Sequence, residues 1–175
     1  VEEVLRVFGF SNVPLPPRMH TSIAIEPRYN AHRMRRLIGQ FLASKGFLEA
    51  MNMSLTQPAY YAGIEWTDST QWVTIHNTSN ESLNLLRPEM LIPTLETVKR
   101  NVNRKQEDLR LFEFGKSYAQ QKELPNETEH LVITMTGQQH ASGWQTGVAK
   151  AVDFFTIKAV VHSLLLRLGI KNWDT

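Results

Sequence analysis

The strongest constraint on the fold of this chain is the segment 109–118, in which a run of apolar residues from Leu111 to Phe114 is interrupted by one acid, Glu113. A short apolar run of this kind is typical of a strand that is covered on both faces. Because burial of an unpaired carboxylate is costly, Glu113 must either have a partner or lie at an edge. A structural ion pair and an interface contact would each satisfy this requirement.

Three segments have the spacing of apolar residues that is typical of helices with one buried face. Further strands are predicted at 47–56, 71–76 and 131–136. This order of helices and strands predicts an α+β domain with an antiparallel sheet flanked by helices. The three helices are residues 29–45 with the stripe Met34, Leu37, Ile38, Phe41 and Leu42; the segment around Pro93 with the stripe Leu91, Leu95, Val98 and Val102; and residues 154–168, which Asp153 is expected to cap.

A proline-rich segment divides the chain near its start. Residues 14–17 include three prolines, which can neither continue a helix nor enter the centre of a sheet. We therefore expect residues 1–17 to be the C-terminal remnant of a preceding module with a stiff linker, and residues 18–175 to form the main domain. The chain begins with Val1 rather than with methionine, and we expect it to be a fragment of a longer polypeptide.

The composition excludes several classes of protein. Of the 175 residues, 42% are hydrophobic, which is enough for a packed core. The absence of cysteine excludes a disulfide scaffold and a cysteine-ligated zinc site. No apolar run reaches the roughly 18 residues of a membrane span, and no signal peptide is present, so we expect a cytoplasmic protein without membrane contact. A net charge of +2 does not by itself indicate nucleic-acid binding.

Familiar catalytic motifs are missing from the sequence. The six histidines show no metal-ligand spacing, and neither a glycine-rich phosphate loop nor a nucleophile elbow occurs. We therefore predict no catalytic residue in this chain.

Two groups of basic residues are candidate binding residues. Arg87 precedes a proline just before a predicted helix, so it either binds an anion or pairs with a nearby acid such as Glu89 or Glu81. A second group begins on the helix around Pro93, off its apolar stripe, and either contacts RNA or an acidic partner, or forms a solvated helix face. Its members are Lys99, Arg100, Arg104 and Lys105, with Arg110 further along the chain.

The adjacent acids Glu2 and Glu3 are the only candidate metal ligands. A hard cation needs several oxygen ligands, so this pair could supply only part of a site.

An ordered set of segments over nearly the whole chain resembles the bacterial phenylalanine–tRNA ligase beta chain. The segments are Val1–Pro14, Phe47–Ala50, His76–Ser82, Leu86–Arg87, Asn101–Lys105, Leu111–Gly115, Trp144 and Val152–Lys158.

The resemblance implies a core like that of a class II aminoacyl-tRNA synthetase. In that family the alpha chain activates phenylalanine with ATP and charges the tRNA, while the beta core is non-catalytic and supports assembly in an (αβ)2 heterotetramer. Residues 29–56 would correspond to the interface motif of class II enzymes. Glu2 and Glu3 match part of a magnesium site whose remaining ligands lie outside this chain. We therefore expect neither Mg²⁺ nor ATP to be bound by this fragment.

The chain also departs from the pattern of active class II enzymes, because it lacks a glycine-rich segment that ends in a catalytic arginine. It is therefore expected to be inactive alone. Two alternatives remain open. An active class II synthetase would catalyse phenylalanine-dependent ATP–pyrophosphate exchange. A standalone RNA-binding module would bind tRNA tightly, in a salt-sensitive manner, through Lys99, Arg100, Arg104 and Lys105.

Overall fold

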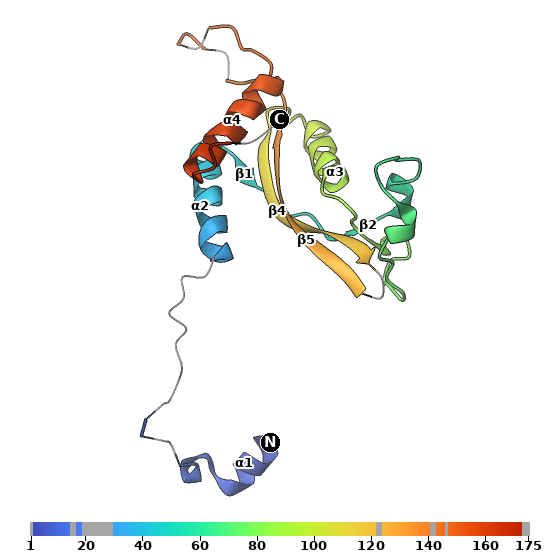
Figure 1. Ribbon diagram of the computed structural model, residues 1–175, viewed down its shortest axis with the longest axis vertical. Helices are drawn as coiled ribbons and strands as arrows, with labels where there is room; N and C mark the ends of the chain where they lie inside the picture. Colours follow the sequence, from blue (N-terminus) through green and yellow to red (C-terminus); the bar gives the residue numbers. More distant parts are fainter. Residues whose placement is uncertain are drawn as a thin grey trace. The chain divides into compact units, whose positions relative to one another are not determined.

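A computed structural model describes residues 2–14, 17–18, 30–121, 124–140, 143–145 and 147–172, in two compact units that divide between residues 30 and 31 (Figure 1). The first unit contains helix α1 (Glu2–Phe8) and the 3-10 helix η1 (Phe10–Asn12). Gly9, whose φ is 87°, separates these two helices. The predicted boundary at residues 17 and 18 stays a prediction, because most of the segment around it lies outside the described residues.

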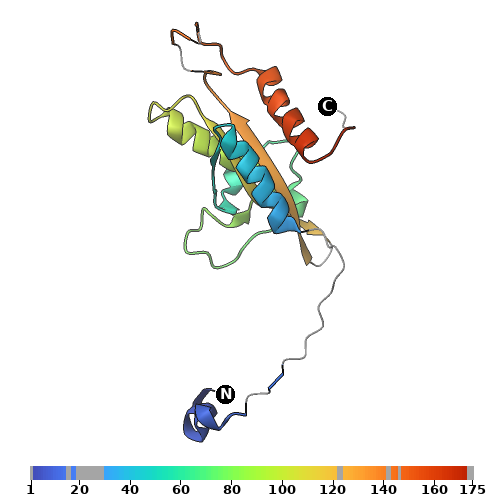
Figure 2. The same ribbon diagram turned by 90° about the vertical axis from the view of Figure 1, so that its left-hand side faces the viewer.

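The second unit is a three-layer α+β arrangement, as predicted (Figures 1 and 2). Its central sheet has the strand order β1-β4-β5. Helices α2 and α4 lie on one face of this sheet and helix α3 lies on the other. The elements are α2 (Ala31–Ser44), β1 (Leu48–Glu49), α3 (Leu91–Val102), β4 (Arg110–Gln121), β5 (Leu124–Met135) and α4 (Phe154–Arg167).

The sheet is mixed rather than purely antiparallel. Strands β4 and β5 pair antiparallel along their whole length, with Phe112 opposite Ile133, whereas β1 joins β4 in parallel, with Leu48 opposite Leu111. A second, smaller antiparallel sheet is formed by β2 (Leu55–Thr56) and β3 (Leu85–Leu86).

Two of the strand predictions were wrong in extent. The single strand expected at 47–56 is split into β1 and β2, which belong to different sheets, because Asn52 leaves the ladder and bonds Glu113 with its backbone N–H and its side chain. The strand expected at 71–76 is reduced to an isolated bridge between Thr74 and Leu85. Just before it, Asp68 accepts a hydrogen bond from the backbone N–H of Thr70 and starts the 3-10 helix η3 (Ser69–Gln71).

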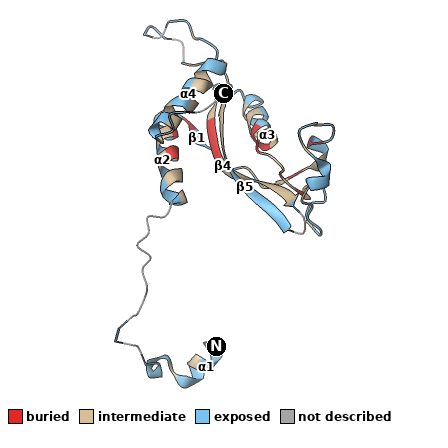
Figure 3. Cartoon of the chain, viewed as in Figure 1, coloured by how far each residue is buried: buried red, intermediate tan, exposed pale blue. Residues whose placement is uncertain are grey.

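The main core lies between the sheet and helices α2 and α4 (Figure 3). The predicted stripe of α2 faces it, with Ile38 and Leu42 buried and Met34 and Phe41 packed beside them. Strand β4 contributes Phe112 and α4 contributes Leu164. Gly46 ends this part of the chain after α2, with a φ of 83° that suits glycine.

The predicted inward stripe of α3 was wrong. Leu91, Leu95 and Val102 are exposed, and the helix instead buries Pro93 and Thr94. The inward side of α3 also carries Thr97, which bonds Asn52. The helix therefore packs through small and polar residues on a polar region beside Glu113, and its most apolar stripe faces outward.

The end of α3 offers a test of backbone strain, because Lys105 adopts a φ of 65°, where an L side chain is unfavourable. We expect Lys105→Gly to raise the free energy of unfolding by about 0.5–1 kcal/mol, since glycine adopts this conformation without steric cost. Lys105→Ala removes the charge but keeps Cβ, so it should leave the stability nearly unchanged. Urea denaturation of the two variants checks this, and an equal gain in both would assign the effect to charge instead.

Helix α4 begins at the predicted cap. Asp153 accepts a hydrogen bond from the backbone N–H of Thr156 at 2.8 Å, and the Thr156 hydroxyl lies 3.4 Å from the backbone nitrogen of Asp153, which completes a capping box. The hydroxyl and the backbone N–H of Thr156 hold the pKa of the Asp153 carboxyl below its ordinary value of 3.8.

This lowered pKa predicts a pH dependence of stability. The ionised carboxylate contributes stability that is fully present above pH 3.8 and is lost as the pH falls through the lower folded-state pKa. Asp153→Asn keeps a capping side chain but does not titrate. We therefore expect the stability difference between the parent chain and this variant to shrink as the pH is lowered from about 6 to about 2.5. Urea denaturation at several pH values measures this difference, and a constant difference would contradict the prediction.

Candidate functional site

The structure brings together two candidate residues that are far apart in the sequence, Arg87 and Glu113. Arg87 Nη1 lies 3.0 Å from Glu113 Oε1, and the two side chains are only 3% and 4% exposed. Arg87 Nε also donates a hydrogen bond to the backbone carbonyl of Lys116 at 2.9 Å. The partner of Arg87 is therefore neither Glu89 nor Glu81. Glu89 instead accepts hydrogen bonds from the first backbone N–H groups of α3, those of Leu91 and Ile92.

Two polar residues complete the surroundings of the buried pair. Glu113 accepts hydrogen bonds from the backbone N–H of Asn52 at 3.1 Å and from its side-chain nitrogen at 2.6 Å. The Thr97 hydroxyl donates to the side-chain oxygen of Asn52 at 2.6 Å. This set of Arg87, Glu113, Asn52 and Thr97 is called the buried network below. The two charges of the buried network compensate each other, and neither charged group faces solvent.

Gly115 makes room for the buried network. A Cβ atom added at this position would overlap the guanidinium of Arg87 and lie 2.7 Å from Met90 Sδ. Only a residue without a side chain allows Arg87 to approach β4 this closely.

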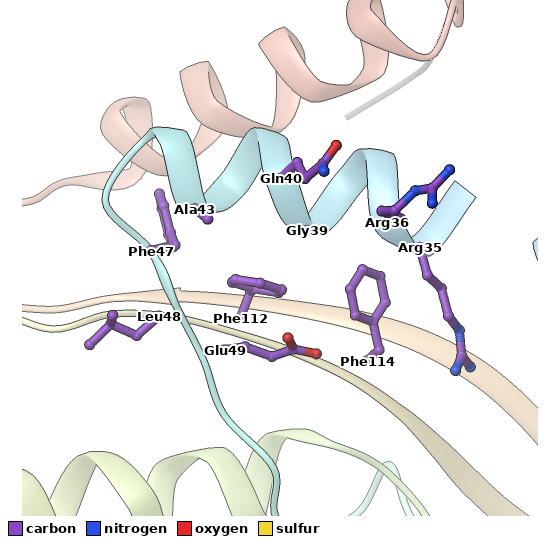
Figure 4. Close-up of a pocket in the computed structure, with 10 residues that line it drawn as sticks. All are labelled: Arg35, Arg36, Gly39, Gln40, Ala43, Phe47, Leu48, Glu49, Phe112 and Phe114. Atoms are coloured by element: carbon purple, nitrogen blue, oxygen red, sulfur yellow. The ribbon is translucent and has the colours of Figure 1, made fainter. Parts of the chain in front are cut away.

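A groove of about 590 Å³ lies between α2 and the β1 side of the sheet (Figure 4). Aromatic rings from Phe47, Phe112 and Phe114 line its interior, while Arg36 and Glu49 supply charge at its rim. We call it the α2–β1 groove.

Glycine keeps the α2–β1 groove open on its helical side. The position that a Cβ of Gly39 would occupy is 3.8 Å from the rings of Phe112 and Phe114, so the helix contributes no side chain there. Arg35 borders the same groove, pairs with Glu129 of β5 at 3.0 Å, and lies 5.8 Å from the ring centre of Phe114.

Apolar side chains continue from the groove onto the adjoining surface. Leu48 is 70% exposed and Met51 is 94% exposed, and Met53 is exposed as well. Strand β1 is only two residues long and lies at one edge of the sheet. An edge strand beside an apolar groove is a surface that can accept another polypeptide segment.

The predicted basic group lies at the C-terminal end of α3, where Lys99, Arg100, Arg104 and Lys105 are all exposed. None of these four side chains makes an ion pair with another residue that the structure describes. Arg110 is separate from them and is structural. It donates hydrogen bonds to the backbone carbonyls of Lys45 and Gln139.

The candidate metal ligands Glu2 and Glu3 lie in the first turn of α1. Glu3 is 3.6 Å from Arg6, and both side chains are exposed. Within the described part of the chain, no group of three or more histidine, cysteine, aspartate or glutamate residues could hold a metal ion. The pair alone does not fit a hard cation, which needs more oxygen ligands than two neighbouring side chains provide.

Sequence reasoning missed the contributions of Asn52, Thr97, Gly39 and Gly115. Only Gly115 carried a usable signal, because a glycine within an apolar strand indicates a close approach of another group.

None of the described helices is both long and apolar enough to cross a membrane.

Comparison with known proteins gives a consistent family match. Residues 15–175 match the family described as "Phenylalanyl tRNA synthetase beta chain CLM domain". The phenylalanine–tRNA ligase beta subunits of Bacteroides thetaiotaomicron and Bacillus cereus are 32% and 34% identical to this chain over 180 and 181 residues. These alignments cover 97% and 100% of this chain but 22% of each relative. The chain thus spans about a fifth of the length of the curated relatives it matches.

Solved structures support the class of fold. A pyrrolysyl tRNA synthetase from Desulfitobacterium hafniense aligns with a TM-score of 0.57 at 19% identity, covering 82% of this chain and 46% of that one. An ATP phosphoribosyltransferase regulatory subunit/histidyl-tRNA synthetase from Bacillus halodurans aligns with a TM-score of 0.55 at 15% identity, covering 91% and 40%. At these identities the likeness shows the fold alone, which is that of the class II synthetase core.

Proposed function

The chain belongs to the family of phenylalanyl tRNA synthetase beta chain CLM domains, and on this premise we propose that it is the non-catalytic core of a phenylalanine–tRNA ligase beta chain. In this proposal the complete ligase attaches phenylalanine to its tRNA with ATP, and this core supports assembly with the alpha chain in an (αβ)2 heterotetramer. The complete enzyme would act in the cytoplasm.

The α2–β1 groove is the observation that carries the assembly role. It combines an aromatic interior, a charged rim and an adjoining edge strand with exposed Leu48 and Met51. Such a combination of apolar centre and polar border is typical of protein interfaces. Apart from Phe112 and Phe114, the residues that line the groove fall within residues 29–56, the segment that the family resemblance relates to the class II interface motif.

The buried network supports the absence of chemistry in this core. Arginine side chains that act on phosphate must reach it, whereas Arg87 is enclosed and neutralised by Glu113. Mg²⁺ and ATP would serve the complete ligase. Glu2 and Glu3 could take part in a metal site only together with ligands from beyond this chain, and no reaction step is assigned to them.

Light scattering coupled to size exclusion, with the purified alpha chain, tests the assembly role. We expect a species that contains both chains, and we expect Leu48→Asp to abolish it, since a carboxylate would be buried against the aromatic groove. Leu124→Asp is a matched control, because Leu124 is similarly exposed but lies at the opposite end of β5 from Ile133 and Thr134, which pair with the β4 residues beside β1.

Two results would contradict the proposal. Failure of the parent chain to bind the alpha chain at high concentration would remove the assembly role. Phenylalanine-dependent ATP–pyrophosphate exchange by the 175-residue chain alone would remove the claim that it is non-catalytic.

A further inference from the structure

The outer face of α3 carries an apolar ridge that the fold covers only in part. Leu91 and Leu95 are each 47% exposed and Val102 is 39% exposed, and the partly buried Val98 lies between them on the same side of the helix. Their spacing of four, three and four residues aligns them along the whole helix. We call these four residues the α3 ridge.

The α3 ridge is separate from the side by which α3 packs on its own sheet. That side consists of Pro93, Thr94 and Thr97, and Thr94 and Thr97 are both satisfied by hydrogen bonds within the fold. These small and polar residues thus anchor the helix on its sheet. An aliphatic stripe that runs three turns in length and leaves its two leucines about half exposed marks an interaction surface.

Positive charge is concentrated at one end of the α3 ridge. Lys99, Arg100, Arg104 and Lys105 are exposed there, and none has an ion-pair partner among the described residues. Lys99 and Arg100 lie in the last turn of the helix, where the helix dipole favours positive charge, and Arg104 and Lys105 follow just beyond it. Asp108, further along the chain, accepts a hydrogen bond from the backbone N–H of Gln138 at 2.7 Å and forms no ion pair with any of them.

We propose that the α3 ridge docks a protein surface that presents an aliphatic stripe ending in carboxylates, with the stripe on Leu91, Leu95, Val98 and Val102 and the carboxylates on the four cations. The proposal rests on the proposed function in one respect: the partner that presents this surface is the alpha chain of the ligase. It adds a second contact face, on the opposite side of the sheet from the α2–β1 groove (Figure 1).

The combination of side chains favours a protein partner over RNA. Proteins that hold single-stranded nucleic acid place aromatic rings among their basic residues so that bases can stack. The α3 ridge has no aromatic residue, and three of its four members lie outside the basic end. Phosphates laid along this face would be desolvated against leucine and valine without compensation, whereas an aliphatic stripe with terminal carboxylates satisfies both parts.

The test measures the dissociation constant for the purified alpha chain by sedimentation velocity. Leu95→Asp probes the α3 ridge and Lys99→Glu/Arg100→Glu probes the charged end. Leu166→Asp in α4, on the opposite face of the sheet, is the matched control, because Leu166 is similarly exposed. We expect both test variants to weaken binding by at least about tenfold and the control to leave it unchanged. Circular dichroism and the melting temperature verify that each variant is folded.

The outcomes separate this proposal from the assembly role itself. If Leu48→Asp abolishes binding while Leu95→Asp does not weaken it, the α3 ridge is not an interface, although the assembly role stands. If the parent chain does not bind the alpha chain, both proposals fail. If Lys99→Glu/Arg100→Glu weakens the binding of tRNA in a salt-dependent manner but leaves the alpha chain unaffected, the charged end serves RNA and the proposal is overturned.

Discussion

Glu113→Ala is expected to lower the free energy of unfolding by about 3–5 kcal/mol, because it leaves the Arg87 guanidinium buried without a counter-charge. Arg87 is 3% exposed and cannot reach water without breaking its contacts to β4. The substitution also removes the acceptor for both nitrogen donors of Asn52. Urea denaturation followed by circular dichroism measures the loss.

An exposed ion pair on the same strands provides the control for this experiment. Lys116 and Glu127 pair across β4 and β5 with side chains that are 40% and 50% exposed. Lys116→Ala should therefore change the stability by no more than about 1 kcal/mol. Replacing both buried charges, as Arg87→Met/Glu113→Leu, should recover much of the loss, because no isolated charge remains. If Glu113→Ala costs no more than Lys116→Ala, the buried network does not stabilise the fold in the way described.

Leu42→Ala is expected to cost about 2–5 kcal/mol, the range for leucine deletions in well-packed cores. The Leu42 side chain is 0% exposed and lies among Ile38, Phe47 and Leu164, where α2, α4 and the sheet meet. These neighbours belong to different elements, so they cannot close over the cavity without shifting a helix. Thermal and urea denaturation both report the loss.

Leu166→Ala is the matched control for this second substitution. It removes the same atoms from a helix position where the side chain is 51% exposed. It should change the stability by less than about 1 kcal/mol, since little apolar area is lost and no cavity forms. Equal effects at the two positions would mean that α2 does not pack as described.

The sequence was sufficient to locate the helices but not to orient all of them. For α2 the apolar stripe and the buried side coincide, so periodicity alone predicted that Ile38 and Leu42 face the core. For α3 the two differ, because its inner side meets the polar surroundings of Glu113 through Thr94 and Thr97. Hydrophobic spacing identifies an apolar face, but it cannot distinguish a face that packs internally from one that is left for another molecule.

The buried network could not be predicted for a different reason. The sequence suggested acids close to Arg87, such as Glu89, as its partner. The actual partner, Glu113, lies 26 positions away on β4. The close approach of Arg87 to Glu113 depends on the break in strand pairing at Asn52 and on the absence of a side chain at Gly115. Neither of these features follows from secondary-structure propensity. Both are properties of the tertiary arrangement.

Close contact among Arg87, Glu113 and Gly115 also restricts how relatives of this chain can diverge. A mutation that removes one of the two charges leaves the other buried without a partner. A mutation that adds a side chain at Gly115 displaces the guanidinium of Arg87. Changes at these three positions are therefore accessible only in combination, through intermediates of lower stability. They should be inherited as a unit in lineages that retain the charged pair, and be lost together in lineages that replace it with an apolar interior.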